Sequence, residues 1–289
     1  MMPRMARSPH AVDPGSQRLG IHLPQYGRAA GPGAVERVAR AAEDLGFDDV
    51  WVSDHVVHPA AQTYPSAYLY DPLVALTWAA AVTARVGLGT SVLVLPQHHP
   101  LALANTLASL DALSRGRVLV AAGVGWSQAE FDALGQSFHD RGPRTDEIIR
   151  LLRACWHDDP VTFHGRWYDV RDIRVLPKPA HDIPIWVGGG VERAYRRAVE
   201  LGDGFHAIGL SPEQVGPVVE RVRRDRPDPS FTFSLRTGWD PQGMDHDRIR
   251  RERDDYAAAG VQHVVSAPWR ENVDDWLRSM ELLVQLLGR

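Results

Sequence analysis

The sequence predicts an α/β protein whose fold is a (β/α)8 TIM barrel. Short runs rich in β-branched residues alternate with longer stretches of helical periodicity, and strands that alternate with helices pair in parallel. We count eight such strand–helix units along the chain. The length of 289 residues also suits a single barrel, because barrels of this type often exceed 250 residues. A doubly wound open sheet has the same alternation and is the alternative fold.

The eight expected strands are short apolar runs, each followed by a helical stretch. They are Leu19–Leu23, Asp49–Ser53, Val86–Leu95, Val118–Ala122, Ile183–Val187, Gly204–Ile208, Phe231–Thr237 and His263–Ala267.

The helices are predicted from buried apolar stripes with i, i+3, i+4, i+7 spacing. In the first helix the stripe is Val35, Val38, Ala39, Ala42 and Leu45, and Gly46 ends that helix as a C′ glycine does. In the last helix, Asn272 is the expected N-cap of the stripe Val273, Trp276, Leu277, Met280, Leu283 and Leu287. The other helices are expected at about Asp71–Thr83, Leu101–Ser114, Arg144–His157, Glu192–Leu201, Pro212–Arg226 and Asp247–Ala259.

Two segments fall outside this alternation. Asp158–Asp182 follows neither period and is interpreted as an insertion between the fourth helix and the fifth strand. Residues 1–17 are basic and Pro-rich without an apolar core, so we interpret them as a disordered tail and not as a secretory signal. The barrel domain is then expected to span residues 18–289.

Composition excludes several classes of protein. The net charge of −4 and the absence of a basic run argue against a nucleic-acid partner. No apolar run reaches the length of a membrane span, so we expect a cytoplasmic protein with no membrane partner. Cys155 is the only cysteine, which rules out an intrachain disulfide and cysteine-rich metal centres, and its apolar surroundings favour a packed core thiol. Lys178 is the only lysine and lies between two prolines, which argues against Schiff-base chemistry.

In a barrel of this kind, function is carried by the loops that follow the strands. These positions hold small residues, a carboxylate, imidazoles and several tryptophans. Glycine lets the backbone approach a ligand closely and aromatic walls exclude water, so this rim suits a flat aromatic ligand.

Gly188, Gly189 and Gly190 follow a predicted strand and precede a helix. Free amides at a helix N-terminus form an anion site, and a tight strand-to-helix turn is the alternative explanation. Asp54 and His55 also follow a strand, where a carboxylate can orient an imidazole for proton transfer. A turn-capping aspartate beside a surface histidine is the alternative there. His58, His98 and His99 lack a coherent ligand spacing, so no metal site is predicted.

Several motifs together resemble the bacterial luciferase-like monooxygenase family. They are Trp51-Val52-Ser53-Asp54-His55, Leu88-Gly89-Thr90-Ser91-Val92-Leu93, Leu110-Asp111-Ala112-Leu113-Ser114-Arg115-Gly116-Arg117, Gly123-Val124-Gly125-Trp126, Arg144 with Glu147, and Pro184-Ile185-Trp186-Val187-Gly188-Gly189. The matches are collinear from about Leu19 to Gly209. The resemblance implies a (β/α)8 barrel with an insertion, often dimeric, that binds FMN or the deazaflavin coenzyme F420.

Details resemble the F420-dependent branch most. The resemblance implies that His55 is an acid/base group and that Ser91-Val92 is a non-prolyl cis peptide forming a bulge behind the deazaflavin ring. It further implies cofactor contacts at Asp54, Ser91, Val92, Gly125, Trp126, Gly188, Gly189 and Gly190. One departure concerns the glutamate that follows the fourth loop in sugar-phosphate dehydrogenases of this branch, since the nearest equivalent here is Gln128.

The resemblance thus implies an F420-dependent oxidoreductase that transfers a hydride between a deazaflavin and a small organic substrate. An FMN-dependent monooxygenase, using oxygen and reduced flavin from a partner reductase, is the alternative. Trp239 and Trp269 are the expected walls of the substrate site, although tryptophans packed at helix–barrel seams are an equal possibility. We expect a homodimer.

Overall fold

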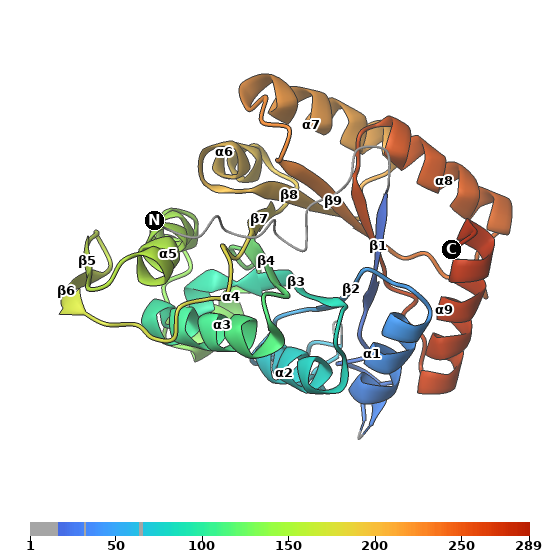
Figure 1. The fold of residues 1–289 in the computed structure, drawn as a ribbon, viewed down its shortest axis with the longest axis horizontal. Helices are drawn as coiled ribbons and strands as arrows, with labels where there is room; N and C mark the ends of the chain where they lie inside the picture. The colour runs from blue at the N-terminus through green and yellow to red at the C-terminus, as the bar shows by residue number, and fades with distance from the viewer. Residues whose placement is uncertain (1–16, 32, 64–65) are drawn as a thin grey trace.

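A computed structural model describes residues 17–31, 33–63 and 66–289 of the protein. Eight parallel strands close into a barrel in the order β1-β10-β9-β8-β7-β4-β3-β2 (Figure 1). Strand β1 pairs with both β2 and β10, so the sheet has no free edge, and the open-sheet alternative is wrong. The predicted TIM barrel is confirmed. Of the expected tail, all but Gln17 lies outside the described residues.

Each predicted strand is present within two residues of its expected bounds. The barrel strands are β1 Arg18–His22, β2 Asp49–Val52, β3 Gly87–Val94, β4 Val118–Gly123, β7 Ile185–Gly188, β8 Gly204–Ile208, β9 Thr232–Thr237 and β10 His263–Ser266.

The predicted helices surround the barrel, and their apolar stripes face the strands. Val35, Val38 and Ala42 of α1 are buried as expected. Asp71 caps α2 and Asn272 caps α9, each accepting hydrogen bonds from backbone N–H groups of the first turn. The bounds are α1 Ala34–Asp44, α2 Pro72–Val82, α3 Pro100–Ser114, α5 Arg141–His157, α6 Glu192–Leu201, α7 Pro212–Asp225, α8 His246–Ala258 and α9 Val273–Leu287.

The predicted insertion is a β-hairpin. Antiparallel strands β5 (Val161–His164) and β6 (Asp169–Ile173) project beyond α5 at the edge of the molecule (Figure 1). Two short elements were not predicted, the 3-10 turn η1 (Leu95–Gln97) and helix α4 (Gln128–Ala133). Cys155 is buried in α5, and burial raises the pKa of its thiol to about 11, as expected for a core cysteine.

The barrel interior is built around Trp51 at the middle of β2. Its indole stacks on the ring of His206 with centroids 5.1 Å apart, and on Trp186 at 5.8 Å. A Cβ added at Gly89 would lie 2.5 Å from the Trp51 ring, so the neighbouring strand β3 has glycine where the indole crosses it. Packing in this layer therefore requires that the large side chain of Trp51 lies against a glycine, Gly89, on the neighbouring strand.

The outer faces of α2 and α3 differ from those of the other helices. Val74 and Trp78 of α2 and Leu113 of α3 are exposed by 64 %, 56 % and 82 %. Helix α2 contains no charged residue, and the one charged residue of α3, Asp111, is buried. Among the described residues, no helix combines the length and the apolar character that a bilayer crossing requires.

We expect Gly89→Ala to lower the free energy of unfolding by about 1–3 kcal/mol, because its methyl group overpacks a rigid indole. Urea denaturation followed by circular dichroism measures the change. Gly31→Ala is the matched control, since a Cβ there meets nothing within 4 Å, and its effect should stay within about 0.5 kcal/mol. Equal stability of the two variants would contradict the packing argument.

Candidate active site

The end of β2 is fixed by a buried glutamine. The Gln25 side chain accepts a hydrogen bond from the backbone N–H of Ser53 at 2.5 Å and donates to the Ser53 carbonyl at 2.9 Å. These bonds take the place of the next ladder pairs, so the strand ends at Val52. Ser53, Asp54 and His55 therefore lie in a loop, where consecutive side chains need not alternate between two faces.

Strand β3 carries a bulge at the same rim. The peptide bond between Ser91 and Val92 is cis, and the register with β4 shifts there. The Val92 side chain lies between Gly123 at the end of β4 and Gly188 at the end of β7. A Cβ at either glycine would come within 2.4 Å of a Val92 methyl group. The bulge thus requires both glycines, and the predicted cis peptide is confirmed.

A chain of hydrogen bonds runs from this bulge down through the barrel. Ser91 Oγ bonds His206 Nε2 at 2.8 Å, and Ser234 Oγ joins His206 Nδ1 to His263 Nδ1 at 2.8 and 2.7 Å. His263 Nε2 then bonds Asp49 Oδ1 at 2.8 Å. Each of these side chains belongs to a residue no more than 2 % exposed. The Ser91 side chain is thereby held from below.

Arg236 near the end of β9 holds the bulge from the side. Its guanidinium donates to the Ser91 carbonyl at 2.6 Å and to Ser53 Oγ at 3.0 Å. His22 Nε2 lies 2.9 Å from the same Ser53 hydroxyl. Burial, and next the charge of Arg236, lower the pKa of His22 to about 3. His22 is therefore neutral, and because its Nδ1 donates to the Leu23 carbonyl at 2.8 Å, its Nε2 is the acceptor that faces the Ser53 hydroxyl.

Asp54 is buried beside the bulge with one oxygen available. Its Oδ2 accepts from Val94 N at 2.8 Å and from His98 Nε2 at 2.7 Å. Burial alone would lower the pKa of His98, but the bond to Asp54 and its charge raise it. Oδ1 is also buried, and no donor within the described part of the chain reaches it. A buried carboxylate oxygen without a donor suits a ligand N–H or O–H group.

His55 forms a second pair on the rim. Its Nδ1 lies 3.1 Å from Oε2 of Glu130 in α4, and Oε1 of that carboxylate accepts from Val56 N at 2.7 Å. Burial would raise the pKa of Glu130, but these bonds and the charge of His55 outweigh it and lower the pKa to about 2. Glu130 is therefore ionised and accepts a hydrogen bond from Nδ1–H of His55, so that Nε2 is the nitrogen that can face a ligand.

Two neighbours border the His55 ring. The His58 ring lies 5.2 Å away, and the Trp126 indole meets it edge-on at 5.8 Å. Trp126 is 60 % exposed on the rim. Before it, Gly125 has a φ of +79°, and a Cβ there would lie 2.6 Å from Phe131, so glycine is required in this turn.

The glycine loop after β7 remains open to a ligand. Gly189 has a φ of +140° and a Cβ on it would press on Ala194, whereas Gly190 has open space around it. Helix α6 begins two residues later, with its first-turn N–H groups toward this loop. Such backbone can form an anion site.

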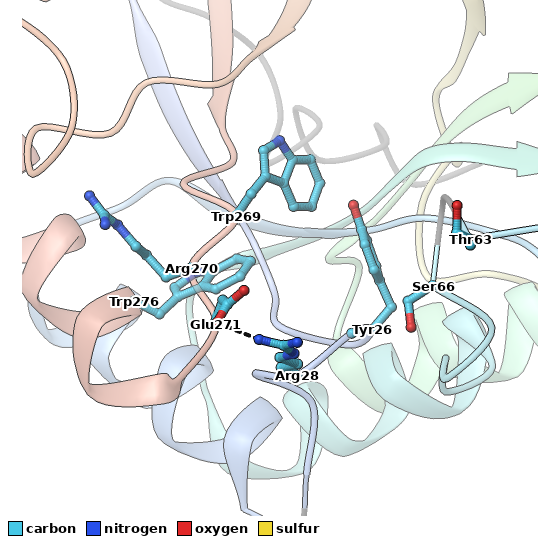
Figure 2. Close-up of a pocket in the computed structure, with 9 residues that line it drawn as sticks. Tyr26, Arg28, Thr63, Ser66, Trp269, Arg270, Glu271 and Trp276 are labelled. Atoms are coloured by element: carbon cyan, nitrogen blue, oxygen red, sulfur yellow. Dashed lines mark hydrogen bonds and ion pairs between the residues drawn. The ribbon is translucent and has the colours of Figure 1, made fainter.

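The two predicted substrate tryptophans have different environments. Trp239 is 1 % exposed and donates from Nε1 to Glu252 of α8 at 2.8 Å, so it is a seam residue that lines no open site. Trp269 is 39 % exposed and lines a cavity of about 460 Å³ with Tyr26, Thr63 and Ser66 (Figure 2). Its φ of +50° is rare for an aromatic residue and turns the indole toward His22, 4.9 Å between centroids.

The luciferase-like monooxygenase family profile matches residues 11–265 of the sequence. The chain belongs to this family. It is accordingly an enzyme, one of the flavin- and deazaflavin-dependent oxidoreductases.

Curated members of the family align with most of the chain. A protein of Kineococcus radiotolerans named F420-dependent glucose-6-phosphate dehydrogenase is 33 % identical over 67 % of this chain, and the match spans 58 % of that protein's length. A protein of the same name from Amycolatopsis mediterranei is 30 % identical over 75 % of this chain and 68 % of its own.

Solved structures share the barrel at lower identity. The monooxygenase RslO1 from Streptomyces bottropensis superposes with a TM-score of 0.79 at 22 % identity, covering 94 % of this chain and 98 % of its own. An F420-dependent secondary alcohol dehydrogenase superposes with a TM-score of 0.76, also at 22 % identity, covering 94 % and 99 %. At this identity the likeness establishes the fold alone.

Two site residues of this family member escaped the sequence analysis. Gln128, interpreted as the nearest equivalent of a family glutamate, is exposed at the start of α4, whereas Glu130 two residues on is buried against His55. The spacing Ser127-x-x-Glu130, a helix-start signature, was the available signal, and Ser127 does cap α4. Arg236 was missed as well, although it is the single charged residue of strand β9.

The Glu130–His55 pair predicts a pH-dependent stability difference between the wild-type protein and Glu130→Gln. The folded pKa of about 2 lies below the ordinary value of 4.5. The carboxylate therefore stabilises the fold above about pH 4.5, and this stabilisation is lost as the pH falls toward 2. The wild type should exceed the variant by up to about 3 kcal/mol near pH 6, with the gap closing at low pH.

Urea titrations at pH 6, 4 and 3 measure this gap. Glu281→Gln is the control, because it removes a glutamate paired with Arg278 on the surface of α9. A gap that stays constant across these pH values would rule out an ionised, buried Glu130.

Proposed function

We propose that this enzyme is an F420-dependent oxidoreductase that transfers a hydride between the deazaflavin and a small organic substrate. The observation that carries the proposal is the arrangement of side chains around the Ser91-Val92 bulge. Beside it lie the buried carboxylate of Asp54, with one oxygen that no donor of the described residues reaches, and His55, which Glu130 orients. Relatives named as F420-dependent, at 30–34 % identity, support the choice of cofactor.

The residues present fit such a cofactor. The Ser91-Val92 bulge would support the flat ring, and Asp54 Oδ1 would accept a hydrogen bond from it. The glycine loop Gly188–Gly190 and the N-terminus of α6 would take the anionic tail. Gly125 and Trp126 border the same opening. When bound, a deazaflavin supplies a ring carbon that accepts or returns a hydride.

His55 handles the proton that accompanies the hydride. Ionised Glu130 accepts a hydrogen bond from Nδ1–H, so the Nε2 lone pair is available. Nε2 would take the hydroxyl proton of an alcohol substrate while the alcohol carbon gives up its hydride to the cofactor. In the opposite direction the protonated ring returns that proton to a carbonyl oxygen. Glu130 is a positioning residue, since it fixes the tautomer and stabilises the imidazolium.

We also propose a homodimer formed through α2 and α3. Val74, Trp78 and Leu113 expose apolar surface on adjacent helices, without a charge on the exposed face of either. Faces of this kind are common in obligate homodimer interfaces. A small-molecule substrate and a reductase that recycles the cofactor complete the expected partners.

Cofactor titration tests the assignment. The purified protein, titrated separately with F420 and FMN while its tryptophan fluorescence is followed, should bind F420 at least tenfold more tightly. Tighter binding of reduced FMN, with oxygen consumed on substrate addition, would establish the monooxygenase alternative instead. Binding of neither cofactor would exclude both.

His55→Ala should lower turnover by about 10²–10⁴-fold and leave the Kd for F420 within a few-fold, because the ring transfers a proton and does not anchor the cofactor. Turnover is measured as F420 reduction, followed by absorbance, with the best substrate from a panel of alcohols. His164→Ala is the control, an exposed histidine of the hairpin paired with Asp169. Loss of F420 binding together with turnover would make His55 a cofactor ligand.

A further inference from the structure

We propose that the cavity beside Trp269 selects an uncharged substrate with a flat apolar face and rejects phosphorylated sugars. This rests on the proposed function in one respect, that the cavity holds the substrate of the F420 reaction. The relatives named glucose-6-phosphate dehydrogenase would suggest a phosphate ester here. The side chains that line the cavity support a different substrate class.

Side-chain contacts link the cavity to the bulge where the reaction is proposed to occur. Trp269 is its inner wall and packs against His22, whose ring bonds Ser53 at the edge of the bulge. Tyr26 packs on Trp269 with ring centroids 5.2 Å apart, so the two rings form one aromatic wall, and the buried Trp276 also lines the cavity (Figure 2). An aromatic wall beside about 460 Å³ of space suits a flat apolar group of naphthalene size.

The cations of the cavity are neutralised by the protein's own carboxylates. Arg28 lies 2.8 Å from Glu271, which also lines the cavity (Figure 2). Arg270 lies 2.5 Å from Asp240. An exposed pair such as Arg28–Glu271 contributes little to stability, but it places a negative charge where a phosphate would bind. A phosphate dianion would meet Glu271 and displace it at a cost.

Two further cations of the described chain are directed elsewhere. The guanidinium of Arg236 donates to the Ser53 hydroxyl and to the Ser91 carbonyl. Lys178, the single lysine of the sequence, donates to the carbonyls of Cys155 and Asp158, next to the hairpin. Besides the paired charges, the cavity offers the hydroxyls of Thr63 and Ser66. A hydroxyl can donate to and accept from an alcohol or a carbonyl group, but it carries no positive charge to balance a dianion.

The decisive experiment compares two ligands that share one ring system. 2-Naphthol is neutral at pH 7.5 and 2-naphthyl phosphate is a dianion. Isothermal titration of the full chain, with and without saturating F420, should give a Kd at least tenfold lower for 2-naphthol. Glu271→Gln removes the negative charge and releases Arg28. It should therefore reduce the ratio of the Kd for 2-naphthyl phosphate to the Kd for 2-naphthol at least threefold, chiefly because 2-naphthyl phosphate binds more tightly.

Two control variants locate the effect. Glu281→Gln breaks a comparable surface pair, Arg278–Glu281, and should leave the ratio unchanged. Trp269→Ala should weaken 2-naphthol binding at least tenfold, whereas Trp167→Ala, a tryptophan of the hairpin turn that donates to Asp140, should not.

Glucose 6-phosphate separates the two proposals. Binding of glucose 6-phosphate more tightly than 2-naphthol, or its oxidation with F420 reduction, would overturn the neutral-substrate inference while supporting F420 dependence. A protein that discriminates the naphthyl ligands as expected but binds no F420 would overturn the proposed function and leave the selectivity of the cavity standing.

Discussion

The buried carboxylate of Asp49 is the interaction on which the barrel interior depends. It accepts hydrogen bonds from His263, Trp51 and Arg18. Burial would raise the pKa of Asp49, but the charges and bonds of these neighbours more than offset it and hold the pKa well below its ordinary value. His263 bonds Asp49 through Nε2 and Ser234 through Nδ1, and Ser234 bonds His206, which bonds Ser91, so the positions of these side chains follow from that of Asp49. The orientation of the bulge is set at the opposite end of the barrel.

This anchoring explains how the Ser91-Val92 bulge, the proposed cofactor bed, is held in place while the side chains beside it remain available to a ligand. Burial and next the charge of Arg236 lower the pKa of His206 well below 6.5, so the ring is neutral beneath the bulge. Ser91 is held from below through its hydroxyl and from the side through its carbonyl, and Val92 lies between Gly123 and Gly188. Asp54 and His55 can therefore direct polar atoms outward. Preorganisation of this kind is what positions a reacting pair without further rearrangement.

The sequence predicts the fold well because a barrel repeats one signal, a short apolar run followed by a helical stretch, eight times. Helix α4 was missed because six residues are too few to show a period. Trp239 and Trp269 follow strands in the same way, and only the φ of +50° at Trp269 and the carboxylate of Glu252 near Trp239 separate them. Partners distant in sequence, such as His55 and Glu130, are not visible in a local pattern.

The proposed cofactor site is formed by strand ends, whereas the proposed substrate cavity is formed by loops. This difference affects how far the cofactor and the substrate can be inferred from relatives. The proposed cofactor bed is made of strand ends that the barrel interior fixes, through Ser91, Gly123 and Gly188. The cavity is lined mainly by loop residues after β1, β2 and β10, among them Tyr26, Ser66 and Trp269. Loops tolerate substitution that interior positions do not. At about 30 % identity, the relatives named as F420-dependent therefore support a common cofactor more strongly than a common substrate. The substrate preference that we propose depends instead on the ion pairs of Glu271 and Asp240.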